Sequence, residues 1–266
     1  MTPVLVFDIE TIPDVAGLRR LNNLQTELSD DEVVELAYQQ RRAQAGHDFL
    51  PLHLQRIVTI SCVLRVGDQF KVWSLSEPAL GEAQIIQRFF DGIEKYTPQL
   101  VSWNGGGFDL PVLHYRGLLH RIQAARYWDM GGGDYPDSRD FKWNNYISRY
   151  HTRHLDLMDL LAMYQPRANA PLDALVKLMG FPGKLGMDGS QVWPAWQAGQ
   201  QAEIRDYCET DVVNTYLIYN RFRLMQGEIS REEEALEAKF VRQQLSLLSG
   251  EHWKQFCDAW AEEGGA

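Results

Sequence analysis

The chain begins with an apolar run that ends in two acidic residues spaced two positions apart. The run covers Val4 to Phe7, and Asp8 and Glu10 follow it on either side of Ile9. Apolar runs of this length are typical of buried strands, and side chains two positions apart on a strand point to the same face. We therefore expect a central strand that presents two carboxylates together, an arrangement in which both groups stay ionised only at a cost unless cations are bound.

Two further segments place acids where neighbouring elements begin. Asp109 closes a glycine-rich stretch that starts at Asn104, directly after an apolar strand, so it lies where a strand gives way to a helix. Tyr207 and Asp211 are four residues apart in a long helical pattern, and this spacing stacks both side chains on one helical face. Each segment alone has an ordinary structural explanation, but the three together in this order predict a common site.

These segments resemble the three exonuclease motifs of the DEDD superfamily of 3′-5′ exonucleases, in its tyrosine branch (DEDDy). The stretch from Asn104 to Asp109 is similar to the Asn-x-x-x-Phe-Asp motif in the proofreading domain of family B DNA polymerases. The resemblance runs from about Val4 to Phe222. As a whole, the chain resembles free-standing bacterial proteins described as predicted 3′-5′ exonucleases related to that domain. The histidine branch does not fit, because it requires a histidine where this chain has Asp206.

The resemblance implies a two-metal-ion site for phosphodiester hydrolysis. Two divalent cations, about 4 Å apart, would activate water and stabilise the leaving oxygen. Oxygen ligands suit Mg²⁺, for which Mn²⁺ should substitute. Asp8 would bridge both ions, while Glu10 and Asp211 would hold one of them and Asp109 would support the other. Tyr207, the fifth implied catalytic residue, would orient the attacking water.

The order of the expected elements is that of a ribonuclease H-like fold, an α/β fold in which helices flank a five-stranded mixed sheet. After the first strand we expect a hairpin of two strands that turns near Gly67 and Asp68. A helix, a fourth strand, another helix, a fifth strand and further helices follow. The expected ranges are 56–64, 70–75, 100–103 and 154–157 for the later strands, and 81–96, 109–122, 172–179 and 203–225 for the helices.

The chain divides into an expected exonuclease domain over residues 1–226 and an acidic helical extension over residues 227–266. Within the domain, residues 14–53 form an insertion with a helix near 31–44, for which Ser29 is a capping candidate. The extension carries an imperfect apolar stripe that can pack back on the core or dock a partner. We favour packing, because amphipathic helices usually cover their own core.

The composition is that of an ordinary globular protein. A chain of 266 residues, of which 45% are hydrophobic and 23% charged, is long enough for one large domain. Cys62, Cys208 and Cys257 are far apart in the sequence, so we expect neutral thiols and no disulfide framework. We found no membrane-spanning stretch and no leader ahead of the first strand, and therefore expect a cytoplasmic protein without membrane partners.

The formal net charge of -10 at pH 7 restricts how this chain can hold nucleic acid. Phosphate contacts normally come from Lys and Arg, and their strength falls with salt. Part of the negative charge belongs to the predicted metal ligands, and part belongs to the extension. We therefore expect weak, salt-sensitive binding of a few nucleotides at single-stranded 3′ ends, without wrapping of a duplex.

Substrate contacts are expected from two regions. The family pattern places Thr11, Asn104 and Phe108 beside the terminal nucleotide, although Thr11 can merely cap a turn and Phe108 can merely fill the core. Between the second motif and the fifth strand, aromatic and basic residues are interleaved, which suits base stacking and backbone contact. Trp143 and Arg149 are the candidates there, with a surface loop anchored by its aromatics as the alternative.

We expect a metal-dependent 3′-5′ exonuclease that hydrolyses single-stranded nucleic acid, DNA in preference, to nucleoside 5′-monophosphates. An oligoribonuclease or RNA exonuclease of the same fold is the near alternative, because no motif here reads the 2′-hydroxyl. A non-catalytic nucleic-acid-binding or scaffold module is the distant one, and retention of all five motif residues argues against it. Whether a polymerase or repair protein is a partner is not encoded in any motif.

Overall fold

The computed structural model, which describes residues 2–24 and 27–260, has one five-stranded mixed sheet. The strand order is β3-β2-β1-β4-β5, with β1 antiparallel to β2, β2 antiparallel to β3, and β4 and β5 parallel to β1. The bounds are Val4–Pro13 for β1, Gln55–Val66 for β2, Gln69–Ser76 for β3, Gln99–Ser102 for β4 and His154–Asp156 for β5. This arrangement confirms the expected ribonuclease H-like fold.

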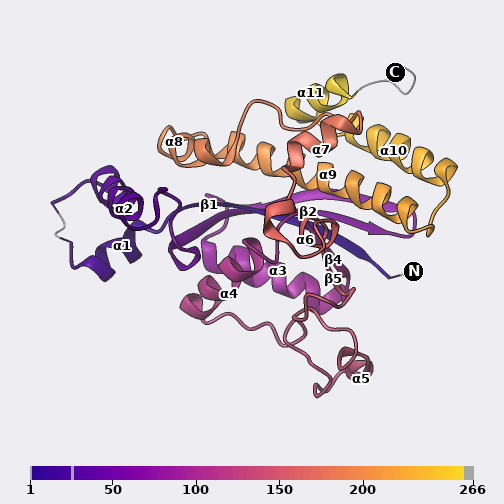
Figure 1. Cartoon of the computed structure of the whole chain (residues 1–266), viewed down its shortest axis with the longest axis horizontal. Helices are drawn as coiled ribbons and strands as arrows, with labels where there is room; N and C mark the ends of the chain where they lie inside the picture. Colours follow the sequence, from indigo (N-terminus) through magenta and orange to yellow (C-terminus); the bar gives the residue numbers. More distant parts are fainter. Residues whose placement is uncertain (1, 25–26, 261–266) are drawn as a thin grey trace.

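Helices cover both faces of the sheet (Figure 1). The long α9 (Gln201–Met225) lies on one face with α7 (Leu172–Leu178), and α3 (Glu82–Tyr96) and α4 (Asp109–His120) lie on the other. Between β5 and α9 the chain also forms α6 (Leu157–Leu161), α8 (Val192–Gln197) and the short η2 (Pro166–Ala168) and η3 (Gly189–Gln191). No helix among the described residues combines the length and apolar character needed to cross a bilayer.

Strand β1 divides its side chains between these two layers. Leu5, Phe7 and Ile9 pack in the core cluster beneath α3 and α4, whereas Val6 packs in the cluster beneath α9. Because successive side chains on a strand alternate between faces, the even-numbered positions that follow Val6 also face α9. The ladder with β2 shifts register directly after Glu10, and such bulges often re-aim side chains next to active sites.

The insertion between β1 and β2 contains two helices, α1 (Val15–Asn22) and α2 (Asp30–Ala45), and the short η1 (Leu52–Leu54). The expected helix is confirmed as α2, and its N-terminus has a capping box between Ser29 and Glu32. Helix α1 was not predicted. The insertion has a small core of its own and projects from one end of the molecule, at the left of Figure 1.

The segment between α4 and β5 is a folded loop with one short helix, α5 (Ser138–Phe141). Tyr127, Phe141 and Tyr146 are buried in the core cluster on the α3 and α4 side. Trp143, by contrast, is 75% exposed. Three of the seven aromatic residues of this segment therefore anchor the loop, as the alternative interpretation expects, whereas Trp128, Trp143 and Tyr150 are exposed.

Two helices of the C-terminal extension, α10 (Arg231–Ser246) and α11 (Glu251–Ala259), lie against α9 (Figure 1). Val241 of α10 and Phe256 of α11 are fully buried in the same core cluster as the apolar residues of α9. Arg65 of β2 binds Glu237 of α10 through two hydrogen bonds of 2.8 and 2.9 Å. The expectation that the extension packs on the core is confirmed for its described residues, 227–260.

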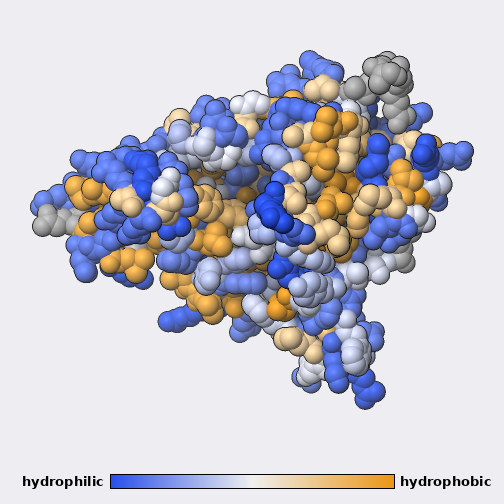
Figure 2. Space-filling model, viewed as in Figure 1, coloured by the Kyte–Doolittle hydropathy of each residue, from blue (hydrophilic) through white to orange (hydrophobic). Residues whose placement is uncertain are grey.

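Hydrophobic side chains on the surface gather over a few elements (Figure 2). The most exposed of them are Leu178, in α7, at 86% and Leu118, in α4, at 79%. Single exposed leucines are normal on a protein surface, so neither position indicates a binding site by itself.

Candidate active site

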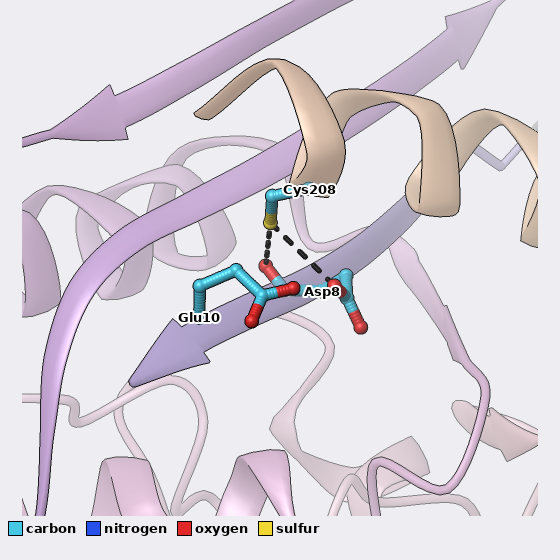
Figure 3. A group of neighbouring side chains, drawn as sticks. All are labelled: Asp8, Glu10 and Cys208. Carbon is cyan, nitrogen blue, oxygen red and sulfur yellow. Dashed lines mark hydrogen bonds between the residues drawn. The ribbon is translucent and has the colours of Figure 1, made fainter. Parts of the chain in front are cut away.

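Asp8 and Glu10 lie on the face of β1 that α9 covers. Cys208 projects from α9 toward the strand, and its Sγ lies 3.5 Å from both the backbone oxygen and Oδ2 of Asp8 (Figure 3). One ligand atom from each of Asp8, Glu10 and Cys208 lies within 4.8 Å of the others. The predicted acid pair of β1 thus faces the predicted tyrosine helix.

Asp109 reaches the same strand from its other side. It is the first residue of α4 and is only 3% exposed, and its Oδ1 accepts a 3.1 Å hydrogen bond from the backbone N–H of Ile9. Ile9 stands between the two acids of β1, so this bond fixes the third carboxylate beside them.

The loop before Asp109 is shaped by Asp156, at the end of β5. Its carboxylate accepts backbone hydrogen bonds from Asn104, at 2.9 Å, and from Gly106, at 2.8 Å. Asn104 has a φ of 66°, a left-handed conformation that asparagine tolerates better than most residues. A side chain at Gly105 would collide with Ser102, because its Cβ would lie 2.2 Å from the Ser102 hydroxyl. Glycine and asparagine are therefore required to turn the chain from β4 into α4.

Tyr207 and Asp211 lie one turn apart on α9 and are 7% and 5% exposed. Oδ2 of Asp211 is 3.2 Å from the ammonium of Lys184, which also donates a hydrogen bond to the Tyr207 hydroxyl. Oδ1 of Asp211 is buried and has no hydrogen-bond partner among the residues that the structure describes. Burying a carboxylate oxygen without a hydrogen-bond partner destabilises the folded protein. This atom is therefore a candidate ligand for a cation.

Lys184 is a site residue that the sequence did not reveal. Its backbone N–H donates to Asp173 of α7 at 2.7 Å, and the preceding carbonyl, of Gly183, accepts from Asn214 of α9 at 3.0 Å. Gly183 has a φ of 71°, and a Cβ there would lie 2.5 Å from Asp173. The one available signal was a lysine next to glycines, which marks a turn but gives no indication of what the lysine approaches.

Burial and mutual repulsion dominate the electrostatics of this cluster. The pKa of Asp8 is raised well above its ordinary value by burial and then by the charges of Asp109 and Asp211. Burial likewise raises the pKa of Glu10, with Asp8 adding to the effect. Burial raises the pKa of Asp109 to about 7 and also raises that of Asp211, which Lys184 partly offsets.

The donor set fits divalent cations with oxygen ligands. Four carboxylates from three elements converge, and their raised pKa values show that the cluster lacks positive charge. Burial also raises the pKa of the Cys208 thiol, so the sulfur stays protonated and is a poor ligand. Asp8, Glu10, Asp109 and Asp211 could therefore hold Mg²⁺ or Mn²⁺.

Replacing Lys184 with methionine is expected to destabilise the protein in EDTA by about 2 kcal/mol, because Asp211 loses its counter-ion in a largely buried site. Thermal unfolding with and without Mg²⁺ checks this. Mg²⁺ should reduce the difference in unfolding midpoint between Lys184→Met and wild type. Lys254→Met, at an exposed position of α11, is the control. Equal unfolding midpoints for wild type and Lys184→Met in EDTA would contradict the expectation.

The predicted substrate contacts fall into two groups. Thr11 follows Glu10 directly and donates to Gln55 at 3.0 Å, and Phe108 precedes Asp109, so these two and Asn104 border the acids. Among the described residues, neither Trp143 nor Arg149 makes a hydrogen bond or an ion pair with the four acids. Trp143 follows α5, which projects from the lower right of the molecule in Figure 1. Arg149 pairs with both oxygens of Asp159, at 2.7 and 2.5 Å.

A second polar cluster joins the extension to α9. The two ring nitrogens of His252, in α11, lie 3.3 Å from Asp206 and 3.0 Å from Glu209, both in α9. Burial opposes a charge on this ring, but the neighbouring carboxylates of Asp206 and Glu209 outweigh it and raise the pKa of His252 to about 9. The cluster is therefore a half-buried group of one cation and two carboxylates that holds α11 against α9 beside Tyr207.

Comparison with known proteins gives one family. The family model described as "Predicted 3'-5' exonuclease related to the exonuclease domain of PolB" matches residues 47–260. The match contains Asp109, Tyr207 and Asp211, and it begins after Asp8 and Glu10. No curated protein matches this chain.

A solved structure with a similar chain is the zinc-ion-bound form of the E. coli ExoI–ssDNA complex. The identity is 12% and the TM-score is 0.35, over 85% of this chain and 45% of that chain. The chain thus spans less than half the length of that protein.

Proposed function

Because this chain belongs to the family of predicted 3′-5′ exonucleases related to the exonuclease domain of PolB, we propose that it hydrolyses single-stranded nucleic acid from the 3′ end by a two-metal-ion mechanism of the DEDDy type. The preferred substrate is DNA, and the product is a nucleoside 5′-monophosphate. The observation that carries the proposal is the convergence of four buried carboxylates and a tyrosine from β1, α4 and α9.

The carboxylates serve as ligands. Asp8 lies between the other acids and would contact both cations, Glu10 and Asp211 would hold one of them, and Asp109 would support the other. When bound, the two cations would activate the attacking water and stabilise the leaving 3′-oxygen. The orphaned Oδ1 of Asp211 and the raised pKa values of the cluster support this assignment.

Tyr207 would orient the attacking water. Burial, and then the charge of Glu10, raise the pKa of Tyr207, so its hydroxyl stays protonated and can donate a hydrogen bond. Attack on the phosphorus breaks the bond to the 3′-oxygen of the preceding nucleotide. The phosphate then leaves on the terminal nucleotide, and the shortened strand keeps a 3′-hydroxyl.

The proposal extends to the organisation of the chain. Residues 1–226 would form the exonuclease domain and residues 227–266 an extension that supports α9. Thr11, Asn104 and Phe108 would hold the terminal nucleotide. Trp143 and Arg149 stay predicted substrate contacts.

The test is digestion of 5′-labelled single-stranded DNA and RNA of identical sequence with Mg²⁺ or Mn²⁺, beside an Asp8→Ala control that excludes contaminating nucleases. We expect a ladder that shortens from the 3′ end, faster for DNA and absent in the control. Faster loss of RNA would assign the alternative activity. Cleavage of a circular single strand, or no cleavage of either substrate, would reject a 3′-5′ exonuclease.

A further inference from the structure

The insertion contributes an aromatic side chain to the border of the acid cluster. Phe49, in the loop after α2, lies against Phe108, with ring centroids 5.8 Å apart and planes inclined by 52°. Phe108 directly precedes Asp109. Phe49 remains 52% exposed despite this contact, so the pair leaves a large part of one ring open to solvent beside the site.

Hydrogen bonds fix the loop that carries Phe49 to the end of β1. The backbone oxygen of Phe49 accepts from Arg41 at 3.0 Å, and that of Leu50 accepts from the side chain of Gln55 at 3.1 Å. The same Gln55 side chain accepts from the Thr11 hydroxyl at 3.0 Å. Phe49 is therefore held in position relative to the strand that carries Asp8 and Glu10.

The aromatic surface continues along α4. Tyr115 is 49% exposed, and His53 of the insertion meets it edge-on with ring centroids 6.1 Å apart. Tyr115 is seven residues after Phe108, which on a helix means two turns along the same face. Two rings of the insertion thus face Phe108, at the N-cap of α4, and Tyr115, within α4. We call Phe49, His53, Phe108 and Tyr115 the aromatic seam.

The aromatic seam has the length of a short stacked strand. Seven residues of α-helix rise about 10 Å, which corresponds to roughly three nucleotides at about 3.4 Å each. The seam therefore offers aromatic contacts over a few nucleotides, starting beside Asp109.

We propose that the aromatic seam is the stacking site for the last bases of a single-stranded 3′ end, with Phe49 of the insertion as its principal residue. The inference rests on the proposed function and adds a binding residue from outside the three motifs. Every base presents a flat π-face, so stacking on rings tolerates any sequence. Stacking also needs few Lys or Arg side chains, in agreement with the net charge of -10.

A purely structural role for Phe49 would be to anchor the insertion on α4, and Phe49→Leu separates the two roles. Leucine preserves apolar packing at this half-exposed position but removes the ring. Phe49→Tyr keeps the ring and should behave as wild type. Tyr96→Ala is the control for losing an exposed aromatic elsewhere, because Tyr96 ends α3 and is 41% exposed.

The binding experiment uses single-stranded DNA with 2-aminopurine at one of the last three positions, in Ca²⁺ to limit cleavage. Stacking quenches the fluorescence of 2-aminopurine. We expect wild type, Phe49→Tyr and Tyr96→Ala to quench it and Phe49→Leu to lose the quench at one or more positions. Quenching by Phe49→Leu equal to wild type at all three positions would overturn the stacking site.

The kinetic experiment compares an oligonucleotide with the p-nitrophenyl ester of thymidine 5′-monophosphate, which has no neighbouring base. Phe49→Leu should raise KM for the oligonucleotide about tenfold, the effect of losing one moderate stacking contact, and raise KM for the ester less, because the ester has a single base to stack, while kcat stays the same for both substrates. A lower kcat on both substrates would overturn the inference in favour of a structural role. Phe49-dependent quenching by a wild-type protein that cleaves neither substrate would support the stacking site and reject the proposed function.

Discussion

Replacing Asp8 with asparagine is expected to lower kcat about 10³-fold, because each bound cation stabilises the transition state by several kcal/mol and about 1.4 kcal/mol corresponds to a tenfold change in rate. The same substitution should stabilise the metal-free protein. Burial and the charges of Asp109 and Asp211 raise the pKa of Asp8, which means that its ionised form is unfavourable in the folded state. Asparagine keeps the shape and removes that charge.

These opposite effects distinguish a metal ligand from a structural residue. We expect Asp8→Asn in EDTA at pH 8 to unfold about 2–4 °C higher than wild type, corresponding to about 1 kcal/mol. Asp68→Asn, in the exposed turn between β2 and β3, is the matched control and should change neither property. A variant that is both inactive and less stable in EDTA would show that Asp8 supports the fold and would remove the case for a ligand.

The metal-free protein is expected to lose stability as pH rises from 4 to 8. Below pH 4 a buried carboxyl is protonated in both states and contributes nothing. Between its unfolded pKa of about 3.9 and the folded pKa of Asp109, which burial raises to about 7, the folded state binds more protons than the unfolded state. The free energy of unfolding therefore falls across this window, by at most about 4 kcal/mol from Asp109 alone.

Divalent cations should reverse this loss at the upper end of the window. Protons compete with the cation for the carboxylates more strongly at pH 5 than at pH 8, because the pKa values of these groups are raised. Millimolar Mg²⁺ is thus expected to raise the unfolding midpoint strongly at pH 8 and little at pH 5. Thermal unfolding across pH, in EDTA and in Mg²⁺, measures both effects.

The comparison with Asp109→Asn isolates the carboxyl contribution. Burial lowers the pKa of His154 to about 4, so this residue destabilises the fold as pH falls below its unfolded pKa of about 6.5 and acts against the acids. The His154 contribution is the same in wild type and variant and cancels in the difference. If the difference in free energy of unfolding between wild type and Asp109→Asn stayed constant from pH 4 to pH 8, it would contradict the raised pKa of Asp109.

The parts of the fold that were predictable from sequence are those governed by local patterns. The alternation along β1 placed Asp8 and Glu10 on one face, and the spacing of four on α9 placed Tyr207 and Asp211 together. The capping box at Ser29 marked the start of α2. Each of these rests on a repeat of two or 3.6 residues, or on a hydrogen bond within one turn, so neighbouring residues were sufficient to reveal it.

Lys184 and Phe49 could not be predicted, because long-range contacts position them. Lys184 lies in an irregular segment that is held by Asp173 and Asn214 from two different helices. Phe49 reaches the site through a loop that is tied to β1. Neither position carries a periodic pattern of its own, and only the packed chain brings either of them to the acids.

The loop before β5 shows why aromatic and basic residues together are ambiguous in sequence. The guanidinium groups of Arg126 and Arg153 each lie over the ring of Phe141, 3.9 Å from its centroid. The contacts expected with bases are thus made within the protein. Helix α8 was missed for a different reason, since it has six residues and contains a proline, too short to display a period.

The division of β1 between two layers makes this strand sensitive to length in a way that single substitutions do not reveal. Inserting one residue between Val6 and Phe7 would exchange the two faces for the residues that follow, turning both carboxylates into the apolar layer under α3 and α4 and aiming Phe7 at α9. A deletion would do the same. Variation in this stretch should therefore be limited to replacements at constant length, with both acids kept in phase with Val6.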